Sequence, residues 1–187
     1  MNSRERILAA LALKQPDRVP FADIVDETVK VKLMGRQNFT EAEFAQLLGL
    51  DAIGMEDYAA PVFCNTLELE GREYIIDGLI QKEQDLDLIC FPNLSRESFY
   101  DPVKRFVEQY GKDELAIYVK CRWGISGVLY SMGLVGLTYA LYNNPRLVER
   151  LLDRYVEWNC QLVERLNTIG IDFIMNYDNI ACNHGPL

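Results

Sequence analysis

The chain has 187 residues, of which 49% are hydrophobic and 25% are charged, and its formal net charge is -9 at pH 7. This acidic balance disfavours nucleic acid and anionic membranes as partners, because both attract proteins mainly through Lys and Arg. No run approaches the roughly 18 apolar residues of a membrane span, and the charged N-terminus lacks the apolar core of a signal peptide. We therefore expect a cytoplasmic globular protein of one domain, with no nucleic-acid or membrane partner.

In chain order, the first half alternates helical patterns with short apolar runs. The pattern predicts a helix over 2–13, a strand over 19–23, helices over 26–34 and 40–48, and a strand over 51–57. The first helix opens with Asn2 and Glu5, the spacing of a capping box. Both predicted strands end in acidic residues.

The residue pattern changes at the start of the second half. Residues 66–76 alternate polar and apolar side chains around Glu70-Gly71, which predicts an antiparallel hairpin outside the main sheet. An irregular connector, helices and two further strands follow. The pattern places helices over 101–110, 126–143 (with a break near Gly133 or Gly136) and 144–169, and strands over 115–123 and 171–177.

The cysteines of this chain are five in number and widely spaced. They are Cys64, Cys90, Cys121, Cys160 and Cys182. The count is odd and no Cys-x-x-Cys pair occurs, so we expect buried, reduced thiols of a cytosolic protein.

Four core strands separated by helical material are half of an eightfold α/β barrel. A complete barrel of this type needs about 250 residues and carries its chemistry at the C-terminal ends of its strands. The sequence therefore predicts a TIM-type (β/α)8 barrel of which this chain supplies the N-terminal half, plus a β-hairpin excursion. Residues 1–187 would form a single domain that is truncated at its C-terminal end.

Several stretches carry a family resemblance through their order and spacing. They are M-N-S-R-E-R-I-L-A-A-L-A-L-K-Q-P-D-R-V-P, L-I-Q-K-E-Q-D-L-D, Y-A-L-Y-N-N-P-R-L-V-E-R-L-L-D-R-Y and G-I-D-F-I-M-N-Y-D-N-I-A-C-N-H-G-P-L. Together they resemble the uroporphyrinogen decarboxylase (URO-D) superfamily over the whole chain, which matches the N-terminal half of that family's barrel. The resemblance implies tetrapyrrole-related chemistry.

Two branches of that family remain open. One decarboxylates the acetate arms of uroporphyrinogen in porphyrin biosynthesis, without metal or cofactor. The other comprises corrinoid-linked methyltransferases, which use zinc to activate a thiol and take a methyl group from a cobamide on a corrinoid protein. The D-N-I-A and G-P-L stretches resemble the methyltransferase branch more closely. Its zinc ligands come from the other half of the barrel, so we expect neither zinc nor corrinoid to be held by this chain alone.

The resemblance implies two catalytic residues. Asp57 ends the second core strand and matches the carboxylate that accepts pyrrole N–H groups in the decarboxylase. Tyr130, just past the third strand, matches a tyrosine that faces the substrate, and Ser126 matches a small hydroxyl residue of the same loop. The plainer alternatives are a capping or solvated acid for Asp57 and a core aromatic for Tyr130.

Further polar residues follow the third and fourth strands. Lys120 and Arg122 share one face of a strand, where two cations are costly unless they reach a cleft or pair with acids. Arg122 is therefore a substrate-binding candidate, and a structural ion-pair network is the alternative. Asp178 and Asn179 end the fourth strand, where the family places a polar substrate contact.

The C-terminal loop contains two metal-ligand types. Cys182 and His184 lie two positions apart, but a zinc site needs three or four ligands. We read His184 as a loop histidine and expect no metal site within this chain.

One departure from the family separates the hypotheses. The decarboxylase clamps substrate carboxylates with an arginine-rich loop after its first strand, whereas this chain reads F-A-D-I-V-D-E-T-V-K-V-K-L-M-G-R there. An acidic loop is a poor host for a polycarboxylate, which favours the methyltransferase-like reading over decarboxylation. The third hypothesis is a non-catalytic half-barrel whose open strand edges associate with a second copy, or with a separate C-terminal half.

Overall fold

A computed structural model describes residues 1–55, 58, 60–69, 72–112, 114–178, 181–182 and 185–186. The chain divides into two compact units, each of which we describe by itself. The sheet unit comprises residues 1–57, 97–120 and 166–175, and the hairpin unit comprises residues 58–96, 121–165 and 176–187. The expectation that residues 1–187 form a single, truncated domain stays a prediction.

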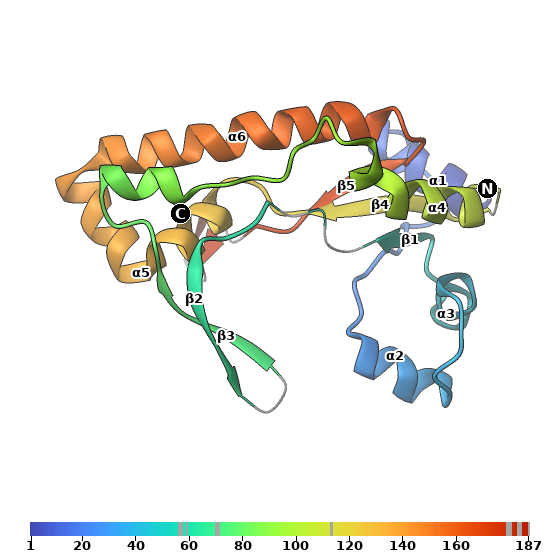
Figure 1. The fold of residues 1–187 in the computed structure, drawn as a ribbon. Coiled ribbons are helices and arrows are strands. Elements are labelled where there is room, and N and C mark those ends of the chain that lie inside the picture. The colour runs from blue at the N-terminus through green and yellow to red at the C-terminus, as the bar shows by residue number, and fades with distance from the viewer. Residues whose placement is uncertain are drawn as a thin grey trace. The chain divides into compact units, whose positions relative to one another are not determined.

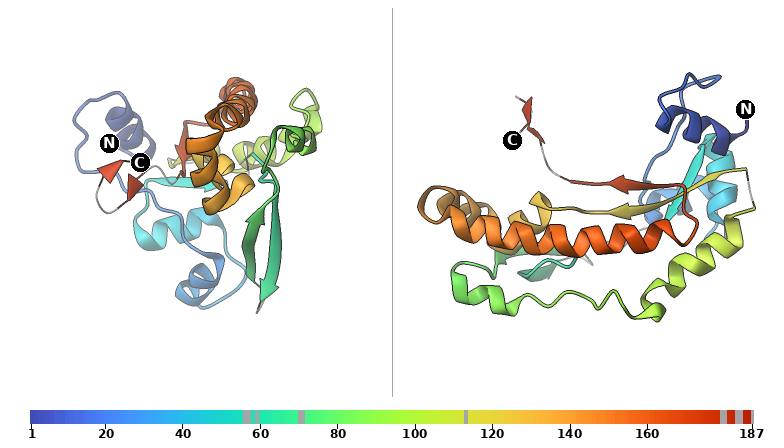
Figure 2. Two further views of the ribbon diagram at one scale, coloured as in Figure 1. Left: turned by 90° about the vertical axis from the view of Figure 1, so that its left-hand side faces the viewer. Right: turned by 90° about the horizontal axis from the view of Figure 1, so that it is seen from above.

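A small parallel sheet forms the centre of the sheet unit. Among the described residues it has three strands in the order β1-β4-β5, and β1 runs parallel to β4 with Ile53 opposite Ile117. Figure 2 shows β5 running in the same direction as β4. The elements of this unit are α1 (Ser3–Leu11), α2 (Glu27–Met34), α3 (Glu41–Leu48), β1 (Ala52–Met55), η2 (Glu97–Tyr100), α4 (Asp101–Tyr110), β4 (Ala116–Cys121) and β5 (Phe173–Asn176).

Local caps place the helices of the sheet unit where the sequence predicts them. Asn2 and Glu5 form a capping box at the start of α1, and Thr40 and Glu43 form another at the start of α3. Gly49 ends α3 in the left-handed conformation, with φ 69°. The capping box that the sequence predicts at Asn2 and Glu5 is therefore confirmed.

The predicted strand over 19–23 is wrong. This segment is irregular, with Val19 84% exposed and Phe21 47% exposed, so the described part of the sheet has three strands and not four. Pro20 has no N–H to give to a ladder. The N–H of Phe21 donates to the side chain of Asp51 at 2.8 Å instead of to a strand.

The sheet unit buries two carboxylates just before its strands. Asp51 precedes β1 and accepts from Arg6 at 2.5 Å and from Arg18 at 2.7 Å, with its side chain 0% exposed. Asp172 precedes β5 with its side chain 6% exposed, pairs with Arg4 at 2.8 Å and accepts from the N–H of Ile117 at 2.9 Å. Two arginines of α1 are thereby joined to the starts of two strands.

The pKa of the Asp51 carboxyl is lowered. Desolvation acts to raise it, but the hydrogen bonds from the N–H of Phe21 and from Ser3, Arg18 and Arg6 outweigh burial. A lowered pKa in the folded state means that the charged form contributes stability above the pKa of the unfolded chain. That contribution is lost as the pH falls through the folded pKa.

We expect Asp51→Ala to lower the free energy of unfolding by about 3 kcal/mol at neutral pH, because it removes one of the carboxylates that pair with the buried Arg6, Asp17 being the other. Urea unfolding followed by circular dichroism measures this loss. The difference from the wild type should shrink below about pH 4, where the carboxyl of the unfolded chain takes up its proton. Asp153→Ala, on the exposed side of a helix, is the control and should cost under about 0.5 kcal/mol. Equal losses for the two variants would refute the role of Asp51.

The hairpin unit combines a long antiparallel hairpin with two helices (Figure 1). Leu67 lies opposite Tyr74 in the predicted hairpin, and the turn at Glu70-Gly71 lies outside the described residues. The hairpin packs against the first of the two helices. The elements of this unit are β2 (Cys64–Leu69), β3 (Arg72–Gly78), η1 (Glu83–Leu88), α5 (Ile125–Asn143), α6 (Pro145–Asn167), β6 (Ala181–Cys182) and β7 (Gly185–Pro186).

Helix α5 breaks at Gly133, one of the two predicted positions. Gly133 has φ 70° and ψ 156°, which interrupts the helical hydrogen bonds. The carbonyl of Ser131 accepts from the N–H of Ile80 at 2.9 Å, and that of Met132 accepts from the Gln81 side chain at 2.9 Å. The break therefore joins the end of the hairpin to the middle of the helix.

A buried hydroxyl network crosses the hairpin unit at Tyr155. The Tyr155 hydroxyl lies 2.8 Å from Ser131 Oγ and donates to the carbonyl of Pro61 at 2.8 Å. Ser131 Oγ also accepts from the N–H of Phe63 at 3.0 Å. Burial raises the pKa of Tyr155 to about 12. The tyrosine thus stabilises the unit only while it keeps its proton.

We expect Tyr155→Phe to cost about 1–2 kcal/mol of unfolding free energy at neutral pH, because the Pro61 carbonyl loses its donor. The pKa is raised in the folded state, so this stability is present below about pH 10 and is lost as the pH rises through about 12. Chemical unfolding at pH 8 and pH 11 measures the difference between variant and wild type. A difference that stays constant over that range would contradict the titration of Tyr155.

Within the described residues, one helix, α5, is long and apolar enough to cross a membrane by length and composition. Buried core helices pass the same test, and 39% of this helix segment is buried within the structure. The interruption at Gly133 also leaves backbone groups that bond to the hairpin and not within the helix. These observations fit a partly covered helix of a globular unit.

The cysteines divide by exposure. Cys121 is buried and Cys64 is half-buried, whereas Cys90 and Cys160 are exposed. The expectation of buried thiols is therefore wrong for Cys90 and Cys160. All four are free, as the odd count and the spacing predict.

Candidate functional site

Polar residues gather in the hairpin unit where the chain leaves β4 and β5. Asp178 follows β5, and its carboxylate accepts the N–H of Ser126 at 2.7 Å and the hydroxyl of the same serine. Gly124, with φ 66°, turns the chain from β4 into α5 and supplies no side-chain cap. Asp178 therefore supplies the carboxylate at the positive end of α5. Two sequence-predicted substrate residues, Ser126 and Asp178, are brought together as a helix cap.

Arg122 and Tyr130 form a second contact in this region. The Arg122 guanidinium lies 5.2 Å from the centre of the Tyr130 ring, within the range of a cation–π interaction. Both residues are half-buried. The contact holds the flat face of the guanidinium against an aromatic ring, an arrangement that suits recognition of planar or amide groups.

A pocket of about 520 Å³ lies beside the Ser126–Asp178 pair. Its lining is mostly apolar, with valines of α6 on one wall and polar groups where β4 and β5 end. The lining residues are Trp123, Gly124, Val156, Asn159, Cys160, Val163, Glu164, Asn176 and Asp178. Its volume matches that of small-molecule sites in proteins.

Two buried polar atoms in the pocket residues lack hydrogen-bond partners among the described residues. They are Trp123 Nε1 and Asn159 Oδ1. The Asn159 amide N–H donates to the carbonyl of Tyr155 at 2.8 Å, which fixes the orientation of the amide and leaves its oxygen without a donor. The indole approaches Cys121, but a thiol sulfur is only a weak acceptor. Unsatisfied atoms of this kind are uncommon and mark a region that can gain a polar partner.

The Cys121 thiol is not a nucleophile in this arrangement. Burial raises its pKa to about 11, against a smaller lowering by Trp123. Nucleophilic chemistry needs the thiolate. Cys121 is therefore a packing residue.

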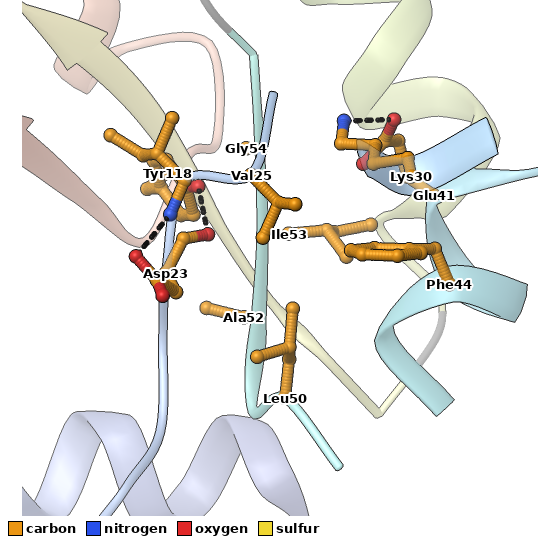
Figure 3. Close-up of a pocket in the computed structure, with 11 residues that line it drawn as sticks. Asp23, Val25, Lys30, Glu41, Phe44, Leu50, Ala52, Ile53, Gly54 and Tyr118 are labelled. Carbon is orange, nitrogen blue, oxygen red and sulfur yellow. Dashed lines mark hydrogen bonds and ion pairs between the residues drawn. The ribbon is translucent and has the colours of Figure 1, made fainter. Parts of the chain in front are cut away.

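A second, much smaller cavity lies in the sheet unit (Figure 3). Its volume of about 20 Å³ is close to the room that one water needs. Lys30 faces Glu41 there at 2.8 Å, and the Tyr118 hydroxyl donates to the carbonyl of Asp23 at 3.2 Å. Gly54 also lines this cavity. A Cβ at that position would overlap the Tyr118 ring, so the close packing there needs a glycine.

Lys30 is an unsuitable base or nucleophile. Burial acts to lower its pKa, but the ion pairs with Glu41 and Glu27 outweigh burial and raise it. Lysine catalysis needs the opposite shift, toward the neutral amine. This cavity is therefore a packed ion-pair site, and the pocket beside Asp178 is the candidate functional site.

Several residues predicted from the sequence lie outside the described residues. They are Asp57, Asn179 and His184. Their roles stay predictions, as does that of Cys182, for which the structure gives only a short backbone pairing with Gly185.

Sequence reasoning missed Asn159. Its signal was present, because it is a polar residue within the apolar stripe of α6, where it is only 4% exposed. Polar residues on a buried helix face need partners, so such an interruption can point to a site.

No group of three or more His, Cys, Asp or Glu side chains converges within the part of the chain that the structure describes. The expectation that the zinc ligands lie in the other half of the barrel stays a prediction, and we derive no step through zinc.

Comparisons with known proteins bear on the fold. No family model matches the chain, and no curated protein matches it. A solved structure, a methyltransferase from Methanosarcina mazei, matches with a TM-score of 0.70 and 19% sequence identity over 98% of this chain. The chain spans 61% of the length of that protein. At this identity the likeness establishes a shared mixed α/β fold with a parallel sheet, and the half-barrel remains a prediction.

We expect Asp178→Ala to destabilise the protein by about 1–2 kcal/mol, because both hydrogen bonds at the start of α5 are lost. Ser126→Ala keeps the backbone bond to Asp178 and should cost less than Asp178→Ala. Urea unfolding of the two variants gives the comparison. If Ser126→Ala costs as much or more, Asp178 is not the cap of this helix.

Proposed function

We propose that this chain forms part of a methyltransferase-like enzyme of the URO-D superfamily and supplies the N-terminal half of its barrel. The observation that carries the proposal is the likeness of 98% of this chain to a methyltransferase fold. The family motifs read from the sequence support the same assignment independently of the coordinates. The protein would work in the cytoplasm.

We assign the chemistry to a corrinoid and not to uroporphyrinogen on grounds of charge. Uroporphyrinogen carries many carboxylates and needs an arginine clamp. The segment after residue 20 begins with acidic residues, and its arginine, Arg36, forms a 2.6 Å ion pair with Glu43. A corrin ring carries neutral amide side chains, which suit donors and acceptors such as Ser, Asp and Asn.

The proposed roles follow the geometry of the hairpin unit. Arg122, held against Tyr130, would contact the edge of the corrin ring, and Ser126 with Asp178 would position the turn that presents Arg122. We also propose substrate-facing roles for Asp57 and Asn179, which the sequence places at strand ends. The partner would be a corrinoid protein.

Uroporphyrinogen decarboxylation is the second candidate, favoured by the carboxylate that the sequence places at Asp57. It needs no metal, since the pyrrole ring serves as electron sink. Substrate charge separates the two candidates in a binding experiment, because one ligand is neutral at its edge and the other is a polyanion.

The experiment is a calorimetric titration of the complete barrel protein that contains this chain with methylcobalamin. We expect saturable binding that Arg122→Ala weakens by about tenfold, because the variant removes the donor that Tyr130 holds in place. Arg105→Ala is the matched control on an exposed position of α4 and should bind as the wild type does.

Two outcomes would remove the corrinoid assignment. One is the absence of saturable binding by the wild type, and the other is equal binding by the wild type and Arg122→Ala. Saturable binding of uroporphyrin in place of methylcobalamin would favour the decarboxylase.

A further inference from the structure

We draw no further inference here: the strongest candidate, the pocket between α6 and the ends of β4 and β5 with the unsatisfied Asn159 Oδ1 in its lining, belongs to the candidate site already described, and nothing in the described part of the chain shows what covers it.

Discussion

The pairing of buried carboxylates with arginines of the first helix is the constraint on which the sheet unit depends. Asp51 and Asp172 stand immediately before β1 and β5, and both follow a glycine and an aliphatic residue. Arg6 and Arg4 reach them from the first turn of α1. A charge buried without its partner is costly, so helix and strands are stable together and not separately. The same carboxylates accept backbone N–H groups that the sheet leaves unpaired, including that of Ile117.

In the hairpin unit, a broken helix joins the hairpin to the rest of the unit. At Gly133 the backbone leaves the helical path, and carbonyls of α5 become acceptors for the chain after the hairpin. A Cβ at Gly78 would meet the backbone of Met132 and Gly133, so a glycine is required for this close approach. The hairpin covers only part of α5. The same break that joins hairpin and helix therefore leaves an apolar helix face exposed.

In the candidate site, the Asp178 carboxylate stabilises the start of α5 and also lines the pocket. Asp178 follows a sheet strand, where α/β proteins commonly carry chemistry, yet its oxygen accepts two bonds from Ser126. Its charge stabilises the positive end of α5 and so fixes the turn that carries Trp123. The unsatisfied polar atoms and the apolar volume lie next to this fixed turn. A mostly apolar pocket with a few polar groups at its edge is the arrangement that small-molecule sites use.

The sequence by itself determined the local structure, because caps and breaks act over a few residues. The cap formed by Asn2 with Glu5 and the break at Gly133 were predicted in this way. Tertiary structure decided the rest. The apolar run at residues 19–23 looked like a strand, but Pro20 and the side chain of Asp51 took its backbone bonds elsewhere. Strand pairing, the Ser126–Asp178 contact and the exposure of α5 join residues far apart in sequence, and no local pattern specifies which distant partner a side chain will meet.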